Sequence, residues 1–232
     1  MTKETLYLLP GMMCDRSLWR HQIETLSPLY DIRVADFTEG DSIEHFADRV
    51  MADAPKEFSI AGLSMGGYIA FDLLRRCPER IKRVALLNTS PFADTEDHAA
   101  FRKAIAEVAR DQGMAQVIET LLPKMIHPSR YEDEELVTQV DAMAYRVGEK
   151  GFIRQQTALL NRVDSFADLA KIDCPTLIVV GRQDQLTPLK LSKQMAEEIP
   201  QAKLVEIETC GHLSTMEQPE AVSAVLRYWM QT

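Results

Sequence analysis

The chain has 232 residues, of which 46% are hydrophobic and 26% are charged, and its formal charge at pH 7 is −9. These ordinary proportions exclude a disordered chain, a collagen-like fibre and a disulfide-rich scaffold, and the length suffices for one domain with or without an insertion. Nucleic acid is not expected as a partner, because the negative charge would repel a phosphate backbone.

Membrane-spanning and targeting segments are not expected either. No run reaches 18 consecutive apolar residues, the length that predicts a transmembrane helix. The apolar run Leu6–Leu9 stops at Pro10 and is too short for the apolar region of a signal peptide. The four cysteines form no CxxC pair; they are Cys14, Cys77, Cys174 and Cys210. We therefore expect reduced thiols and a cytoplasmic protein.

Short apolar runs alternate with amphipathic stretches along most of the chain. The runs predict strands at Leu6–Leu9, Asp31–Ala35, Phe58–Ala61, Val84–Leu87, Thr176–Val180 and Leu204–Ile207. The amphipathic stretches predict helices at Ser17–Leu26, Ile43–Met51, from Gly67 to about Arg76, Leu189–Glu198 and Pro219–Met230. This alternation is typical of an α/β protein whose parallel strands are joined by crossover helices.

The alternation is interrupted between Pro91 and about Asp164. Apolar residues there recur at helical spacing in three stripes, and a fourth, weaker helix is predicted at Phe152–Leu160. About 70 residues of helix without a strand indicate an insertion into the α/β series. We therefore predict a core formed by residues 1–91 and 165–232, and a helical cap formed by residues 92–164.

The sequence Gly62-Leu63-Ser64-Met65-Gly66 lies between a predicted buried strand and a predicted helix. A G-x-S-x-G motif in this setting is typical of a nucleophile elbow, a sharp turn that exposes the serine hydroxyl. Glycines two residues away on either side avoid collisions in such a turn. The helix that follows directs its positive N-terminus toward the site, where it favours a developing oxyanion.

A serine nucleophile requires a base, and the base requires an acid that orients it. His212 follows a predicted strand in a loop at the same sheet edge as Ser64, whereas the other four histidines lie in predicted helices or in the cap. Asp184 directly follows the strongly apolar strand Thr176–Val180. The alternative position for the acid, after the fourth strand, holds Asn88, so we assign the acid to Asp184. The order Ser64, Asp184, His212 is that of α/β-hydrolases.

These features resemble the α/β-hydrolase fold superfamily, in a form with a helical cap, over almost the whole chain. Beyond the elbow motif, the likeness extends to the segment from Cys174 to Asp184 with Thr187-Pro188, and to Gly211-His212 with Glu217 and Pro219. The resemblance implies that Ser64, Asp184 and His212 are nucleophile, acid and base. Many members begin with an antiparallel hairpin that is absent here, so we expect a mostly parallel sheet of about six strands flanked by helices.

The segment Leu8-Leu9-Pro10-Gly11-Met12 resembles the oxyanion loop of this superfamily, although a histidine usually stands where this chain has Pro10. Because Pro10 has no N–H, the resemblance implies that the N–H groups of Met12 and Met65 bind the oxyanion. Methionines offer a deformable apolar surface, which leads us to expect pocket residues at Met13, Met114, Met125 and Met143.

Five cap arginines could hold a substrate carboxylate or phosphate, and the sequence does not say which; they are Arg102, Arg130, Arg146, Arg154 and Arg162. No cluster has metal-ligand spacing and no phosphate-binding loop is present, so neither a metal nor a cofactor is implied.

We therefore expect a serine hydrolase that cleaves a small-molecule carboxylic ester, thioester or lactone with an apolar moiety. Two alternatives remain open at this stage. One is a cofactor-independent lyase or C–C hydrolase of the same fold, of the menaquinone-pathway type, in which Ser64 and His212 act as a base. The other is a non-catalytic protein that binds a small molecule under the cap. The sequence indicates no oligomeric state.

Overall fold

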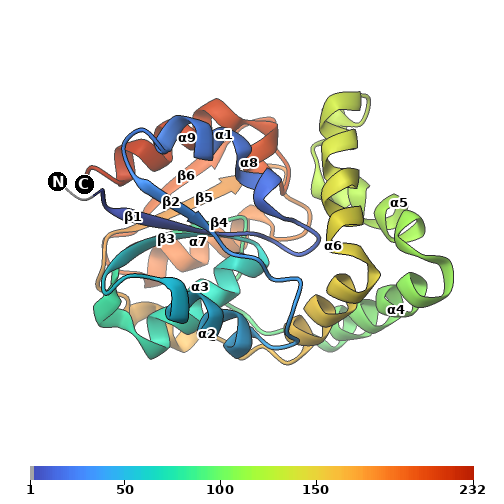
Figure 1. Cartoon of the computed structure of the whole chain (residues 1–232), viewed down its shortest axis with the longest axis horizontal. Coiled ribbons are helices and arrows are strands. Elements are labelled where there is room, and N and C mark those ends of the chain that lie inside the picture. Colours follow the sequence, from blue (N-terminus) through green and yellow to red (C-terminus); the bar gives the residue numbers. More distant parts are fainter. Residues whose placement is uncertain (1–2) are drawn as a thin grey trace.

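The computed structural model describes residues 3–232 and is built around a six-stranded parallel sheet (Figure 1). The strand order is β2-β1-β3-β4-β5-β6, and all neighbouring strands are parallel. The strands are β1 (Thr5–Leu9), β2 (Asp31–Val34), β3 (Phe58–Leu63), β4 (Ile81–Leu87), β5 (Thr176–Gly181) and β6 (Lys203–Ile207). The predicted α/β-hydrolase fold with its six-stranded sheet is confirmed, and the strands differ from prediction only at their ends.

Helices cover both faces of the sheet (Figure 1). One face carries α1 (Arg20–Leu26) and α9 (Pro219–Trp229); the other carries α2 (Ile43–Asp53), α3 (Met65–Arg76) and α7 (Leu189–Glu198). Short helical turns occur at Arg16–Trp19, Pro78–Arg80, Pro128–Arg130, Phe166–Lys171 and α8 (Ser214–Glu217). The predicted helix at Ser17–Leu26 is observed as two pieces, the short turn at Arg16–Trp19 and α1. The Asp15 carboxylate accepts the Ser17 N–H and caps the turn, which therefore begins one residue earlier than predicted.

The alternating side chains of β1 show why the sheet is buried on both sides. Leu6 and Leu8 pack with residues of α1 and α9, whereas Tyr7 and Leu9 pack with residues of α2, α3 and α7. Successive side chains of a strand point to opposite faces. A strand that is apolar at every position therefore needs a helical layer on each side.

Three helices form an insert between β4 and β5, beyond the carboxyl ends of the strands (Figure 1). They are α4 (Glu96–Gln112), α5 (Met114–Met125) and α6 (Glu134–Leu160). Gly148 interrupts the helical geometry of α6 with a φ of 69°. The third and fourth predicted cap helices are thus joined as one kinked element. The limits of the cap at 92 and 164 remain a prediction.

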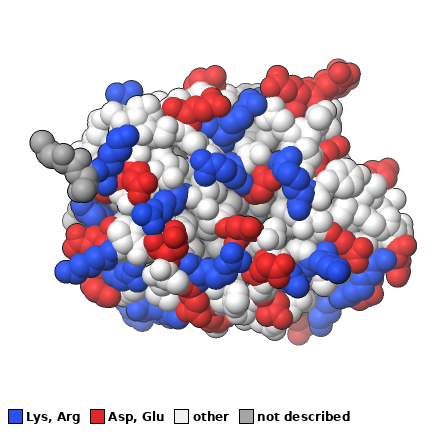
Figure 2. All heavy atoms as spheres, viewed as in Figure 1, with Lys and Arg blue, Asp and Glu red and all other residues white. Residues whose placement is uncertain are grey.

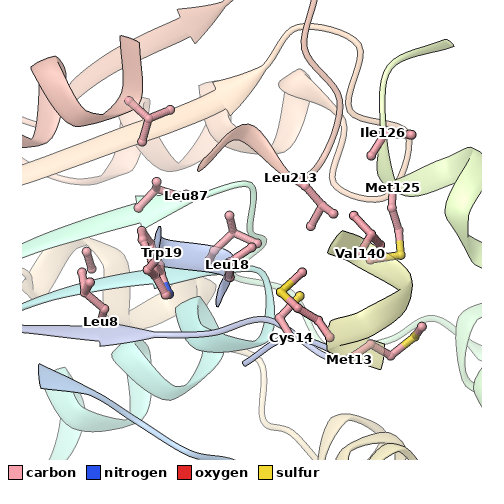
Figure 3. Close-up of a cluster of buried hydrophobic side chains, with 14 of the residues drawn as sticks. Leu8, Met13, Cys14, Leu18, Trp19, Leu87, Met125, Ile126, Val140 and Leu213 are labelled. Atoms are coloured by element: carbon pink, nitrogen blue, oxygen red, sulfur yellow. The ribbon is translucent and has the colours of Figure 1, made fainter. Parts of the chain in front are cut away.

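One hydrophobic cluster extends from the sheet into the insert (Figure 3). It includes Leu8 and Leu87 from the sheet, Met125 from α5 and Val140 from α6. Buried apolar contacts therefore hold the insert against the core, in addition to the two segments of chain that connect them.

The surface seen in Figure 2 carries interleaved acidic and basic side chains. Many of them pair, as Arg76 does with Asp48 and Asp72. Across residues 3–232 no helix combines the length and the apolar character needed to cross a membrane.

Candidate active site

Ser64 occupies the turn between β3 and α3 in a strained backbone conformation, with φ 55° and ψ −113°. The Ser64 N–H donates to the Leu87 carbonyl (3.0 Å), and the Thr89 hydroxyl donates to the Ser64 carbonyl (2.8 Å). Both polar groups of this backbone unit are therefore satisfied by the end of β4 and the residues after it. These contacts hold the conformation that a non-glycine residue would otherwise avoid.

Glycines are required on both sides of this turn. A Cβ at position 62 would lie 2.3 Å from the carbonyl oxygen of Gly66, and one at position 66 would lie 2.0 Å from the carbonyl oxygen of Leu9. Both obstacles are backbone atoms, which cannot rotate away as side chains do. The strand and the helix can thus approach closely enough to lift Ser64 above the sheet edge, as the motif predicts.

Asp184 and His212 form a buried pair. His212 Nδ1 lies 2.8 Å from Asp184 Oδ2, and only 3% of the histidine surface is exposed. The Asp184 carboxylate also accepts the N–H groups of Leu186 and Thr187, each at 2.9 Å. Burial alone would raise the pKa of Asp184, but the charge of His212 and the surrounding donors outweigh burial and hold the pKa below its usual range.

Asn88, at the end of β4, completes the environment of the acid. Its Nδ2 donates to Asp184 Oδ2 (2.9 Å) and to the Gly211 carbonyl (3.1 Å). The Ser214 hydroxyl donates to Asn88 Oδ1 (2.6 Å), which fixes the amide orientation. This role of Asn88 was not predicted from the sequence, because an amide at this position does not indicate a particular partner; its place directly after β4, next to the strand that leads to Ser64, was the one available signal.

The loop that carries His212 is anchored to the insert. The His212 N–H donates to the Met125 carbonyl (3.0 Å) at the end of α5. The buried Glu217 carboxylate accepts the N–H groups of Gly211 (3.0 Å) and His127 (2.7 Å). The insert and the histidine loop therefore hold each other in place.

Two backbone N–H groups lie near the serine, that of Met12 in the segment after β1 and that of Met65 at the start of α3. Gly11 and Met12 line the same cavity as Ser64. Neither the Met12 N–H nor the Met65 N–H donates to another group within residues 3–232. The next residue, Met13, has a φ of 61°, and its N–H donates to Gln155 Oε1 of α6 at 3.0 Å. Two unpaired donors beside the Ser64 side chain have the chemistry of an oxyanion hole.

Ser64 and His212 open into one cavity of about 130 Å³ between the sheet edge and the insert. This volume far exceeds the ~15 Å³ that one water molecule needs, so a small organic group fits. The lining is mainly apolar and includes Leu121, Met125, Leu159, Leu186 and Leu213. No hydrogen bond joins Ser64 to His212, a contact that often tightens only when substrate binds.

Of the four methionines expected in the pocket, Met125 lines this cavity. Met13, Met114 and Met143 lie outside its lining and are buried in the hydrophobic cluster shown in part in Figure 3. Methionine packs equally well in a core and in a pocket. Residue type therefore did not distinguish the two places.

Cys14 also lines the cavity, but burial raises the pKa of its thiol to about 12, with a further contribution from the charge of Asp15. A thiol of this kind is protonated at neutral pH and is a poor nucleophile. Ser64 is thus the better candidate for covalent chemistry.

Among the five insert arginines considered from the sequence, Arg102 lines the cavity. The other four lie outside the lining and pair with carboxylates, as Arg130–Asp133, Arg146–Asp15, Arg154–Glu39 and Arg162–Asp94.

A family model described as alpha/beta hydrolase fold matches residues 54–219, which include Ser64, Asp184 and His212. The chain belongs to this family. It is therefore a hydrolase of the α/β fold, as the motifs predicted.

The chain is similar over most of its length to several hydrolases, including the following three. RutD of Serratia proteamaculans, whose name gives carbamate hydrolysis as its expected activity, is 27% identical over 97% of this chain and 90% of its own length. The pimeloyl-[acyl-carrier protein] methyl ester esterase of Chromobacterium violaceum is 30% identical over 72% of this chain and 67% of its own. A thermophilic esterase from Thermogutta terrifontis superposes with a TM-score of 0.91 and 27% identity, over 99% of this chain and 90% of that one.

Proposed function

We propose that the hydrolase is a serine esterase that cleaves a small carboxylic ester, thioester or lactone through an acyl-enzyme. The observation that supports this most strongly is the placement of Ser64 and His212 in one cavity, with the far nitrogen of the imidazole bonded to Asp184. Two of the three relatives described above are named as esterases. The mainly apolar lining suits an uncharged ester region next to Ser64.

In the proposed mechanism, Ser64 Oγ attacks the substrate carbonyl carbon while His212 Nε2 accepts the hydroxyl proton. The hydrogen bond to Asp184 keeps the second proton of the ring on Nδ1 and stabilises the imidazolium. The negative charge on the former carbonyl oxygen is stabilised by the N–H groups of Met12 and Met65. The tetrahedral intermediate then collapses, and the leaving alcohol takes the proton from His212.

The second half of the reaction regenerates the enzyme. His212 deprotonates a water molecule, which attacks the acyl carbon bound to Ser64. The carboxylic acid leaves, and the proton on His212 returns to the Ser64 hydroxyl. No group beyond the protein side chains, the backbone N–H donors and water takes part in this scheme.

The lyase or C–C hydrolase alternative is less well supported. A substrate with several negative charges would need a basic patch inside the cap. Arg102 is the one arginine or lysine among the described residues that line the cavity, and a single cation does not form such a patch.

The test is a panel of acyl esters graded by chain length, assayed with the wild type, Ser64→Ala and the control Ser129→Ala in an exposed turn of the insert. We expect turnover of at least one ester, a burst of product from an activated ester, and a loss of at least about 10⁴-fold in kcat for Ser64→Ala alone. Turnover that persists in Ser64→Ala, or the absence of a burst together with cleavage of a C–C bond, would overturn the proposal.

A further inference from the structure

Arg102 of α4 reaches the cavity with part of its hydrogen-bonding capacity unused. Its side chain is 18% exposed. Its guanidinium donates twice to Asp94 and once to Gln156 Oε1, the latter at 3.2 Å. A guanidinium has five N–H donors. Two therefore have no partner within the part of the chain that the structure describes, and they belong to a residue that lines the cavity.

The charge of Arg102 is only partly compensated, because its carboxylate partner is shared. Asp94 is almost fully buried and also accepts a hydrogen bond from Arg162 at 2.7 Å. Burial would raise the pKa of Asp94, but the hydrogen bonds from Arg162 and Arg102 outweigh burial and lower it, so this carboxylate is ionised at neutral pH. Two guanidinium groups thus share one buried carboxylate.

Asp164 is a further acid whose charge acts on Arg162, but it does not belong to the residues that line the cavity. It is exposed to solvent, and its carboxylate accepts the backbone N–H groups of Ala93 (3.2 Å) and Phe166 (2.9 Å). Arg162 itself is turned toward Tyr68, whose ring centre lies 4.5 Å from the guanidinium carbon. The cluster of Arg102, Arg162 and Asp94 therefore carries a net positive charge, and of these three residues Arg102 is the one that lines the cavity.

Gln156 of α6 adds a second donor at this place. It is 2% exposed and lines the cavity. Because a guanidinium only donates, the amide oxygen of Gln156 must face Arg102, and the NH₂ group must point elsewhere. That NH₂ group has no hydrogen-bond partner within residues 3–232. The nitrogen is also not among the fully buried polar atoms that lack a partner, so it is accessible and free to donate to a ligand in the cavity that Gln156 lines.

We propose that Arg102 and Gln156 form a subsite for a carboxylate on the substrate, so that the preferred substrates are esters that carry a free carboxylate on the part held by the cap. This inference rests on the proposed esterase function. The single uncompensated cation matches the single charge of a carboxylate, and the unused N–H groups supply charge-assisted hydrogen bonds. The apolar residues of the remaining lining suit the carbon chain between the carboxylate and the scissile ester.

The experiment compares methyl esters of linear monocarboxylic acids with the mono-methyl esters of dicarboxylic acids of equal length. The measured quantity is the ratio of kcat/KM for the half-ester to kcat/KM for the neutral ester. We expect the wild type to prefer the half-ester by about 10-fold or more at one chain length, and Arg102→Met to lower the ratio by at least about 10-fold. Gln156→Glu, which places a carboxylate beside Arg102 without changing shape, is expected to lower it similarly.

The matched control is Arg146→Met. Arg146 also belongs to the insert and pairs with Asp15, but it lies outside the cavity lining. The ratio of kcat/KM for the half-ester to kcat/KM for the neutral ester should be the same in Arg146→Met as in the wild type. Thermal unfolding of each variant shows whether the fold is retained, and Arg102→Lys, which keeps the charge, should restore part of the preference if Arg102→Met is unstable. A ratio that stays unchanged in folded Arg102→Met and Gln156→Glu would overturn the subsite.

Failure of the esterase proposal can be separated from failure of the subsite. If the wild type cleaves no ester, calorimetric binding of adipate to the wild type and to Arg102→Met tests the subsite alone. Binding that weakens by at least about 10-fold in Arg102→Met supports the carboxylate site. Equal binding by the two proteins, or no binding by either, would contradict it.

Discussion

At the scale of single residues, the Asp94 carboxylate is the shared counter-charge of two arginines. It accepts hydrogen bonds from Arg102 and Arg162 and is 4% exposed. We predict that Asp94→Asn lowers the free energy of unfolding by about 3 kcal/mol at pH 7, because it leaves the buried guanidinium of Arg162 and the partly buried guanidinium of Arg102 without their shared counter-charge.

The stability difference between the wild type and Asp94→Asn should depend on pH. The pKa of Asp94 is lowered in the folded protein, chiefly by Arg162 and Arg102 acting against burial. Its ionised form therefore stabilises the fold fully above the unfolded pKa of about 3.9 and loses this effect as pH falls through the lower folded pKa. Denaturant unfolding at several pH values should show the gap between wild type and Asp94→Asn narrowing below about pH 4. A constant gap between pH 6 and pH 3 would contradict this reasoning.

At the scale of elements, Gln155 connects α6 to the loop that follows β1. Its buried side chain accepts the Met13 N–H (3.0 Å) and donates to the Phe37 carbonyl (3.1 Å), so it joins the loops that follow β1 and β2. The neighbouring Met12 N–H is one of the two donors proposed to bind the oxyanion.

We predict that Gln155→Met lowers kcat by about 10- to 100-fold with little change in KM, because the bonds to the oxyanion matter in the transition state rather than in substrate binding. The matched control is Gln139→Met, on the same helix, where the side chain bonds only to Glu135. Steady-state kinetics of both variants on one ester provide the measurement. A rise in KM at constant kcat would indicate a role in binding instead.

The elements that the sequence predicted well are those fixed by local rules. The central strands β1, β3, β4 and β5 are rich in apolar residues, and Ser64, Asp184 and His212 lie in the segments that follow β3, β5 and β6, so a parallel sheet brings them to one edge. Gly62 and Gly66 could be predicted because the elbow leaves no space for a side chain.

The contacts that the sequence did not reveal are long-range and are made by the uncharged side chains of Gln155 and Asn88. Gln155 reaches a loop that lies 142 residues away in the chain, and Asn88 bonds to Asp184 across the sheet edge. Neither residue belongs to a motif that names its partner. Likewise, the positions of Met114 and Met143 depend on how α5 and α6 are rotated about their axes, and residue type alone does not determine that rotation.

At the scale of the whole molecule, the insert and the core share one hydrophobic cluster (Figure 3). Met143 of α6 is fully buried in it, as are Trp19 and Trp229, which lie outside the insert. We therefore expect the insert and the core to unfold together.

We predict that Met143→Ala lowers the free energy of unfolding by about 2–5 kcal/mol. Tryptophan fluorescence should show this entire decrease, although both tryptophans lie in the core and the substitution is in the insert. Far-ultraviolet circular dichroism should give the same midpoint. An early second transition by circular dichroism, with an unchanged fluorescence midpoint, would mean that the insert unfolds independently.

The central claim is that Ser64 forms a covalent acyl-type bond with the help of His212. Its most direct test is the intact mass of the protein after reaction with a fluorophosphonate, followed by mapping of the modified peptide. We predict one adduct on Ser64, no adduct in Ser64→Ala, and strongly slowed labelling in His212→Ala. An adduct on another residue, or labelling of Ser64→Ala at the wild-type rate, would contradict the account.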